Sequence, residues 1–288
     1  MTPVTVWPEL LFAFVVGACV GSFLNVCITR WPHDLSVVRP RSRCPRCERP
    51  ITALDNIPIL SWVLLRGKCR GCALPISTLY PAIELITGLG WLGTVLAFGP
   101  TFTAVRVAVL GTVLLGIAVT DARHYLIPDG FTVFGLLWVF LTAVVGTMLN
   151  QPSPFADPYD AMIGACAGAG AIAIAGWLGE VALKKEAMGF GDVTLMAVIG
   201  AAVGPGRALL VVFVGAVIGV VAFLGVVYPL SRLRRTSAEP QFDLALGDAP
   251  AELPHVPFGV FLAPAALATL LWGYDLIGWY AGRMTGPG

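Results

Sequence analysis

Charged residues are scarce in this chain. Asp, Glu, Lys and Arg make up 12% of its 288 residues, whereas hydrophobic residues make up 57%. Soluble globular domains carry about 25% charged residues, roughly twice that share. The composition therefore excludes a soluble globular protein of this length and predicts an all-α polytopic membrane protein.

Apolar runs long enough to cross a bilayer as helix, about 17–25 residues, recur along the chain. They lie at roughly 7–29, 79–99, 102–120, 131–149, 161–183, 208–230 and 257–281. An eighth run, 190–203, has 14 residues and rises about 21 Å as helix, less than the about 30 Å of a hydrocarbon core. It is either re-entrant or, as we prefer, a full crossing, so we expect about eight transmembrane helices.

No basic residue precedes the first run, so we expect an uncleaved first helix and not a cleavable signal peptide. Lys and Arg accumulate in cytoplasmic loops. Eight crossings place fifteen of the eighteen basic residues on the cytoplasmic side, the exceptions being Arg106, Arg207 and Arg283. This distribution predicts that both termini lie outside.

A disulfide framework is not expected, because four of the seven cysteines share one predicted cytoplasmic, reducing loop, 30–78. Cys44-Pro-Arg-Cys47 and Cys69-Arg-Gly-Cys72 are CxxC turns separated by 21 residues, a spacing that suits four thiolates around one Zn²⁺. A dithiol redox pair or reduced cysteines are the alternatives. The loop's basic residues are explained by topology and anionic lipid, so no nucleic-acid partner is expected.

Three polar residues lie near the ends of predicted helices. Asn25 requires a partner, which a neighbouring helix could supply. Glu84, about one turn into the second helix, lies either at the membrane interface or against a polar cavity. Asp129 follows Pro128 and is predicted to cap the next helix.

Two acids are predicted at the same membrane face, each at the end of a different helix. Asp121 ends the third run, and Asp192 opens the short run in Gly189-Phe-Gly191-Asp192. Close together, two carboxylates hold one shared proton and can act as base and acid in peptide hydrolysis. The glycines would let a substrate backbone run beside the acid. The alternative is that each Asp only caps or solvates a helix end.

The ordered motifs closely resemble those of the bacterial type IV prepilin peptidases (leader peptidase and N-methyltransferase), of the membrane aspartic peptidase class. The motifs are Gly21-Ser-Phe-Leu-Asn-Val26, Cys44-Pro-Arg-Cys47, Asn56-Ile-Pro58, Ser61-Trp62, Leu65-Arg-Gly-Lys-Cys-Arg70, Ile76-Ser77, Tyr80-Pro81, Glu84, Asp121, Ile127-Pro-Asp129, Gly189-Phe-Gly-Asp192 and Pro257-Phe-Gly259. Thr194 stands where the family commonly has lysine.

The resemblance implies an eight-helix inner-membrane enzyme that removes the basic leader of prepilins and pseudopilins at the cytoplasmic face. It makes Asp121 and Asp192 the catalytic pair, supported by Gly189 and Gly191. It also implies N-methylation of the new N-terminus with S-adenosylmethionine, an activity associated with the cysteine loop, although no glycine-rich nucleotide fingerprint is present. The remaining alternatives are a peptidase without methylation and a non-enzymatic scaffold or transporter.

This interpretation divides the chain into a first helix (1–29), a cytoplasmic zinc-ribbon-like domain (30–78) and a transmembrane peptidase domain (79–288). The implied partners are prepilin or pseudopilin substrates and the lipid bilayer. Neither the methyl-donor residues nor the oligomeric state is indicated by the sequence.

Overall fold

The computed structural model describes residues 7–151, 153–184, 188–227 and 257–284. In these ranges the chain is almost entirely helical and forms no β-strand beyond two isolated bridges. The α-helices are α1 (Trp7–Arg30), α2 (Leu60–Leu64), α3 (Leu79–Phe98), α4 (Phe102–His124), α5 (Asp129–Met148), α6 (Pro158–Leu183), α7 (Phe190–Val203), α8 (Pro205–Ala222) and α10 (Gly259–Met284).

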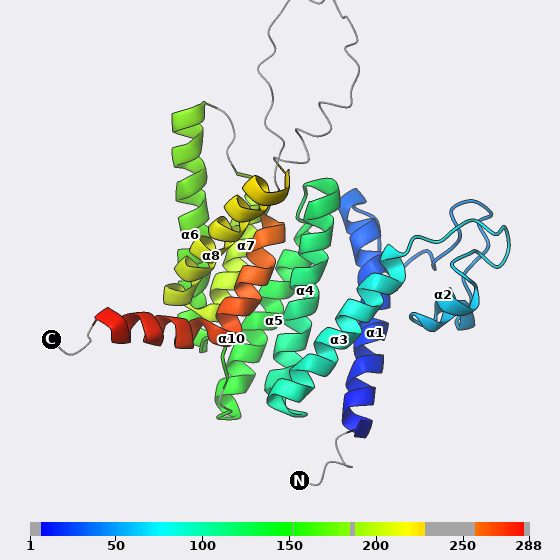
Figure 1. Cartoon of the computed structure of the whole chain (residues 1–288), viewed down its shortest axis with the longest axis horizontal. Helices are drawn as coiled ribbons and strands as arrows, with labels where there is room; N and C mark the ends of the chain where they lie inside the picture. The colour runs from blue at the N-terminus through cyan, green and yellow to red at the C-terminus, as the bar shows by residue number, and fades with distance from the viewer. Residues whose placement is uncertain (1–6, 152, 185–187, 228–256, 285–288) are drawn as a thin grey trace, which may run out of the picture.

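The predicted membrane helices are confirmed. Seven helices of the described ranges are long and apolar enough to cross a membrane, and α7 is the shorter apolar helix. In Figure 1 the last residues of α1, α4 and α6 lie at the upper end of the bundle, where α5, α7 and α10 begin. Successive helices therefore run in opposite directions through the bundle, and α7 and α8 form a helical hairpin joined at Gly204. The predicted polar loop 231–255 lies outside the described residues.

Side chains at the helix starts satisfy backbone donors that have no partner inside the helix. Thr101 caps α4 by accepting from the Ala104 N–H, and Asp157 caps α6 by accepting from the Asp160 N–H. The prediction for Asp129 was wrong by one position. The N-cap of α5 is Pro128, and Asp129 is the first helical residue, because the proline's fixed φ already sets the extended conformation that a cap requires.

Helix α7 lies in the core of the bundle. From Leu195 to Val203 its side chains are buried, apart from the half-buried Ala197, and it packs against α5, α6, α8 and α10. Its contact with α6 has no room for side chains, since a Cβ at Gly164 would meet the Gly200 carbonyl oxygen. Small residues at such a crossing let two helix backbones touch.

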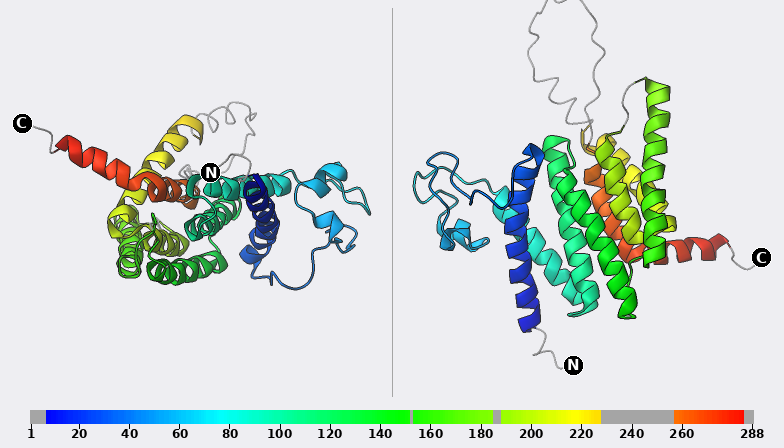
Figure 2. Two further views of the ribbon diagram at one scale, coloured as in Figure 1. Left: turned by 90° about the horizontal axis from the view of Figure 1, so that it is seen from below. Right: turned by 180° about the vertical axis from the view of Figure 1, so that it is seen from behind.

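The loop domain, 30–78, starts at the last residue of α1, and its residues 31–78 lie at one side of the bundle, next to α1 and α3 (Figures 1 and 2). Helix α3 fits closely on α1, because a Cβ at Gly21 would lie 2.9 Å from the Glu84 Cα. The side-chain amide of Asn25 in α1 donates to the Tyr80 carbonyl of α3, at 3.1 Å. The expected partner of Asn25 is thus confirmed.

Three arginines were predicted to lie away from the cytoplasmic side, and two of them are buried. Arg106 and Arg207 are 2% and 3% exposed. Each guanidinium carbon lies 4.1 Å from an aromatic ring centroid, Arg106 over Phe155 and Arg207 over Tyr274. A ring face attracts a cation, so these contacts join α4 to Phe155, which precedes α6, and α8 to the last part of α10. That part, red in Figure 1, projects sideways from the bundle.

Candidate active site and metal centre

Asp121 and Asp192 lie on different helices at the upper end of the bundle (Figure 1). Asp121 is one turn from the end of α4 and is buried, with 6% of its surface exposed. Asp192 is half-buried in the first turn of α7. The charge of Asp121 acts on Asp192, and in the described ranges no hydrogen bond joins the two carboxylates. The fold therefore gathers two acids that are 71 residues apart in the chain.

Backbone N–H groups hold each carboxylate. The Val260 N–H donates to Asp121 Oδ2 at 3.3 Å, and the Gly259 N–H donates to the same carboxylate. Both donors belong to the first turn of α10, where the helix dipole favours negative charge. Asp192 accepts from the Gly189 N–H. The sequence suggested only close packing at Pro257-Phe-Gly259, and the donor role of α10 was missed because nothing in the linear order brings residue 259 to Asp121.

A buried isoleucine fills the space between the three helices. A Cβ at Gly191 would lie 2.9 Å from the Ile127 Cβ, and a Cβ at Gly259 would lie 2.8 Å from Asp121 Oδ2 and 3.3 Å from the Ile127 Cδ1. Ile127 therefore occupies the side of Gly191 to which a side chain would point. A Cβ at Gly189 would have no neighbour closer than Asp192 Oδ2, at 3.9 Å. The open side of the motif is therefore at Gly189.

The four loop cysteines come together as the CxxC spacing predicts. Their sulfur atoms all lie within 4.8 Å of one another. Cys44 Sγ lies 3.7 Å from Cys72 Sγ, and Cys47 Sγ lies 4.0 Å from Cys69 Sγ. A tetrahedral zinc site with Zn–S bonds of about 2.3 Å has sulfur atoms about 3.8 Å apart. The cluster could thus hold one zinc ion, each turn supplying two ligands.

Two similar turns shape this cluster. The Glu48 and Ala73 N–H groups donate to the Cys44 and Cys69 carbonyls, each at 3.0 Å. Donation from the Cys47 and Arg46 N–H groups lowers the pKa of the Cys44 thiol to about 6. The pKa of the Cys72 thiol rises to about 11. The hydrogen bond from the Leu74 N–H lowers this pKa, but burial and the three neighbouring cysteines together raise it by more. Without metal, the cluster thus gives up its first proton readily and holds another tightly.

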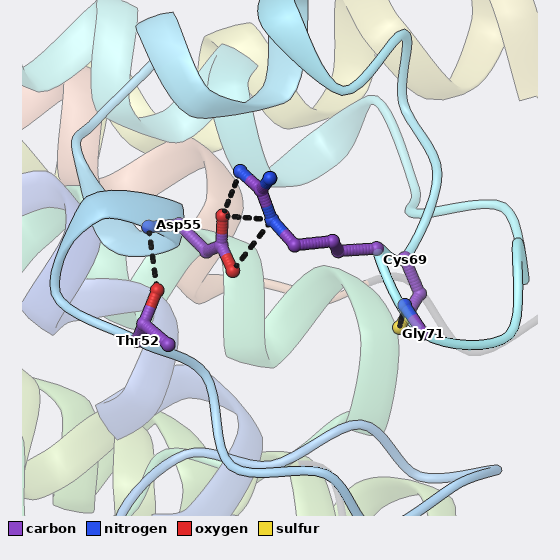
Figure 3. Close-up of polar contacts among 5 residues, drawn as sticks. Thr52, Asp55, Cys69 and Gly71 are labelled. Atoms are coloured by element: carbon purple, nitrogen blue, oxygen red, sulfur yellow. Dashed lines mark hydrogen bonds and ion pairs between the residues drawn. The ribbon is translucent and has the colours of Figure 1, made fainter.

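An ion pair stiffens the segment between the two turns. Arg70 Nη2 lies 2.7 Å from Asp55 Oδ1, and Arg70 Nε lies 2.9 Å from the same oxygen (Figure 3). Hydrogen bonds from Arg70 lower the pKa of Asp55. Because Arg70 stands between the ligands Cys69 and Cys72, this pair ties the metal cluster to the short turn at Leu54–Asn56.

Two family models match the chain. The bacterial peptidase A24 N-terminal domain matches residues 15–98, and the type IV leader peptidase family matches residues 108–224. The first runs from within α1 through the cysteine loop to the end of α3, and the second runs from within α4 through α8 and so includes both acids. The fold and these matches define the class of protein: a multi-pass membrane peptidase of family A24.

Relatives with assigned names narrow this class. The chain is 41% identical to the prepilin leader peptidase/N-methyltransferase of Myxococcus xanthus over 83% of this chain and 69% of that protein. It is 33% identical to the protein of the same name from Aeromonas hydrophila, over 95% and 94% of the two chains. It is also 38% identical to the type 4 prepilin-like proteins leader peptide-processing enzyme of Escherichia coli, over 68% and 77%.

The chain therefore belongs to the type IV leader peptidase family. No solved structure matches it.

Proposed function

We propose that this chain removes the leader of type IV prepilins or pseudopilins and methylates the new N-terminal amine. The observation that carries the peptidase assignment is the gathering of Asp121 and Asp192 at one end of the bundle, within reach of each other's charge. The names of the relatives support both activities. The reaction faces the cytoplasm of the inner membrane, as the distribution of Lys and Arg predicts.

In the proposed mechanism the two acids share one proton. The α10 donors Gly259 and Val260 favour the charged form of Asp121, so we assign the proton to Asp192. Asp121 takes a proton from water as the water oxygen bonds to the scissile carbonyl carbon, and Asp192 donates its proton to the carbonyl oxygen. When the C–N bond breaks, Asp121 gives its proton to the leaving nitrogen, and a hydroxyl of the tetrahedral carbon returns a proton to Asp192 as the carboxylic acid forms, so the dyad regains its starting state.

The chain provides two further parts of this proposal. The loop domain, 30–78, holds a structural zinc at Cys44, Cys47, Cys69 and Cys72 and serves methyl transfer from S-adenosylmethionine. The segment 79–288 forms the peptidase domain, and both termini lie outside.

Mass spectrometry of a processed substrate tests the function. Purified protein and a prepilin, with S-adenosylmethionine, should yield a peptide without its leader that carries one methyl group on its N-terminus. Without the donor, the same cleavage should give an unmethylated peptide. A cleaved but never methylated product would reduce the assignment to a peptidase, and an unprocessed prepilin would favour a scaffold or transporter.

Metal analysis tests the zinc site. We expect one zinc per chain and its loss in Cys44→Ser, because a structural site needs all four thiolates and binds with about 10–16 kcal/mol. Cys166→Ser is the matched control, since Cys166 lies in α6 away from the cluster, and it should keep the full zinc content. Wild-type protein that is stable and active without metal would contradict the structural role.

A further inference from the structure

A cavity of about 410 Å³ lies between the loop domain, the last two turns of α1 and the first turns of α3. It shares no lining residue with the aspartate pair. Asn25 and Glu84 line it from the helices, and Trp62, Asp55 and Arg70 line it from the loop. Its volume falls within the about 300–1,000 Å³ of small-molecule sites.

Glu84 is built firmly into the wall of this cavity. Although charged, it is only 8% exposed, and its Oε2 accepts a hydrogen bond from the Ile59 N–H at 2.7 Å. Ile59 has φ 61° and ψ −53°, and the Leu60 N–H donates back to the Pro58 carbonyl at 2.5 Å. A β-branched residue in such a turn is strained and persists only where its surroundings impose it. In this turn the Ile59 N–H points at the carboxylate of Glu84.

Two acceptor oxygens on this wall are available to a ligand. Glu84 Oε1 and Asn25 Oδ1 accept no hydrogen bond within the described residues, and neither is among the atoms closed off from the surface. Asn25 is fixed because its amide donates to the Tyr80 carbonyl. Four arginines line the cavity: Arg70 is paired with Asp55 at 2.7 Å, Arg30 donates to the Ser36 and Pro40 carbonyls, and the other two are Arg43 and Arg49. A carboxylate oxygen and an amide oxygen that line one cavity, on side chains only 8% and 6% exposed, favour a positively charged ligand group.

The remaining surface suits a flat aromatic group and an anion. Trp62 is held by its indole N–H, which donates to the Ile76 carbonyl at 3.1 Å, so the ring is presented in a fixed orientation. An aromatic face of this kind stacks on nucleobases. Arg70 has only Nε and Nη2 engaged by Asp55, which leaves Nη1 for a ligand carboxylate.

We propose that this cavity binds S-adenosylmethionine, with its sulfonium and ammonium groups toward Glu84 and Asn25, its adenine on Trp62 and its carboxylate toward Arg70. The inference rests on the proposed methyl transfer and adds the residues of the donor site. It also separates the two reactions in space, because the peptidase pair lies on α4 and α7 and the cavity lies against α1 and α3.

The transfer step balances without any further reactant. The neutral amine of the processed substrate attacks the methyl carbon, so an N–C bond forms while the C–S bond breaks. The bonding pair goes to sulfur, which becomes the neutral thioether of S-adenosylhomocysteine. The methylated amine is then positively charged and gives up one proton, for which Glu84 Oε1 is the acceptor at the cavity wall.

Calorimetry on the full-length, zinc-loaded protein in phosphatidylcholine nanodiscs tests the site. Glu84→Gln keeps an acceptor for the Ile59 N–H but removes the charge, and it should weaken S-adenosylmethionine binding about 10- to 100-fold, the effect of one charged hydrogen bond. Ile51→Trp, at an exposed residue of the cavity rim, should block binding by filling space. Glu9→Gln, the same change at the far end of α1, should bind like wild type. Leader cleavage should be unchanged in all three.

The outcomes separate this site from the function on which it rests. If wild type methylates the substrate and both cavity variants bind the donor with wild-type affinity, the site is wrong while the function stands. If wild type cleaves the substrate but neither binds the donor nor methylates, the proposed methyl transfer is wrong, and the proposed donor site is wrong as well. In a separate preparation with phosphatidylglycerol in the nanodiscs, native mass spectrometry would also overturn the proposal if Ile51→Trp removed bound phosphatidylglycerol and left donor binding intact, since the cavity would then be a lipid site.

Discussion

Replacing Asp192 with asparagine should slow leader cleavage by about 100- to 10,000-fold, the usual contribution of a positioned acid or base. The amide keeps the size of the side chain and its acceptor for the Gly189 N–H, so the start of α7 should keep its shape. It cannot release or take up the shared proton. Asp121→Asn should have an effect of the same size, because each member of the pair is useless without the other. Cleavage is measured as the initial rate of leader release from a prepilin in nanodiscs.

The matched control for this prediction is Asp275→Asn, the same change at an exposed position of α10. It should cleave at the wild-type rate. Zinc content and donor binding should be unaffected in the Asp192 and Asp121 variants, since neither residue touches the loop domain. A variant of either acid that still cleaves within about tenfold of wild type would show that the pair is not the proton-transfer machinery.

Gly164→Ala should destabilise the bundle strongly, although it adds only one methyl group. The new Cβ would fall on the carbonyl oxygen of Gly200 and against the Gly204 Cα, and backbone cannot move aside as a side chain can. Overpacking of a tight core costs about 1–3 kcal/mol and sometimes more. Since α7 carries Asp192, the displacement of α7 should also lower cleavage. The midpoint of thermal unfolding in detergent and the cleavage rate report these two effects.

Gly170→Ala provides the control on the same helix, because nothing lies within 4 Å of a Cβ at that position. Its unfolding midpoint should stay at or slightly above that of wild type, as expected for a change that favours helix. Equal midpoints for the Gly164 and Gly170 variants would mean that α6 and α7 do not touch backbone to backbone.

The helices were predictable because lipid leaves a chain few choices. Runs of apolar residues must become helices to satisfy their backbone, so the ends of α3, α5 and α6 fell within a few residues of the expected ones. The short run at 190–203 was also recognisable by its length alone. The cap of α5 was misplaced because Asp129 is a good N-cap residue in isolation, while Pro128 fixes the backbone one position earlier.

Contacts between helices were harder to predict. The CxxC spacing indicated the cysteine cluster, since local turns determine most of its geometry. By contrast, nothing in the sequence indicated that Ile127 would fill the space beside Gly191, or that Glu84 would accept from Ile59 in the loop domain. These contacts join segments that are distant in the chain, and the register of packed helices, not any local propensity, decides them.

The burial of α7 has a consequence for how the enzyme responds to its membrane. A helix that faces lipid tilts or shifts when the bilayer becomes thicker or thinner. Helix α7 is covered by α5, α6, α8 and α10, so its 14 residues need not match the hydrocarbon thickness at all. The depth of Asp192 is fixed by neighbouring protein. Cells that change the length of their acyl chains with temperature would therefore keep this carboxylate at a constant height relative to Asp121.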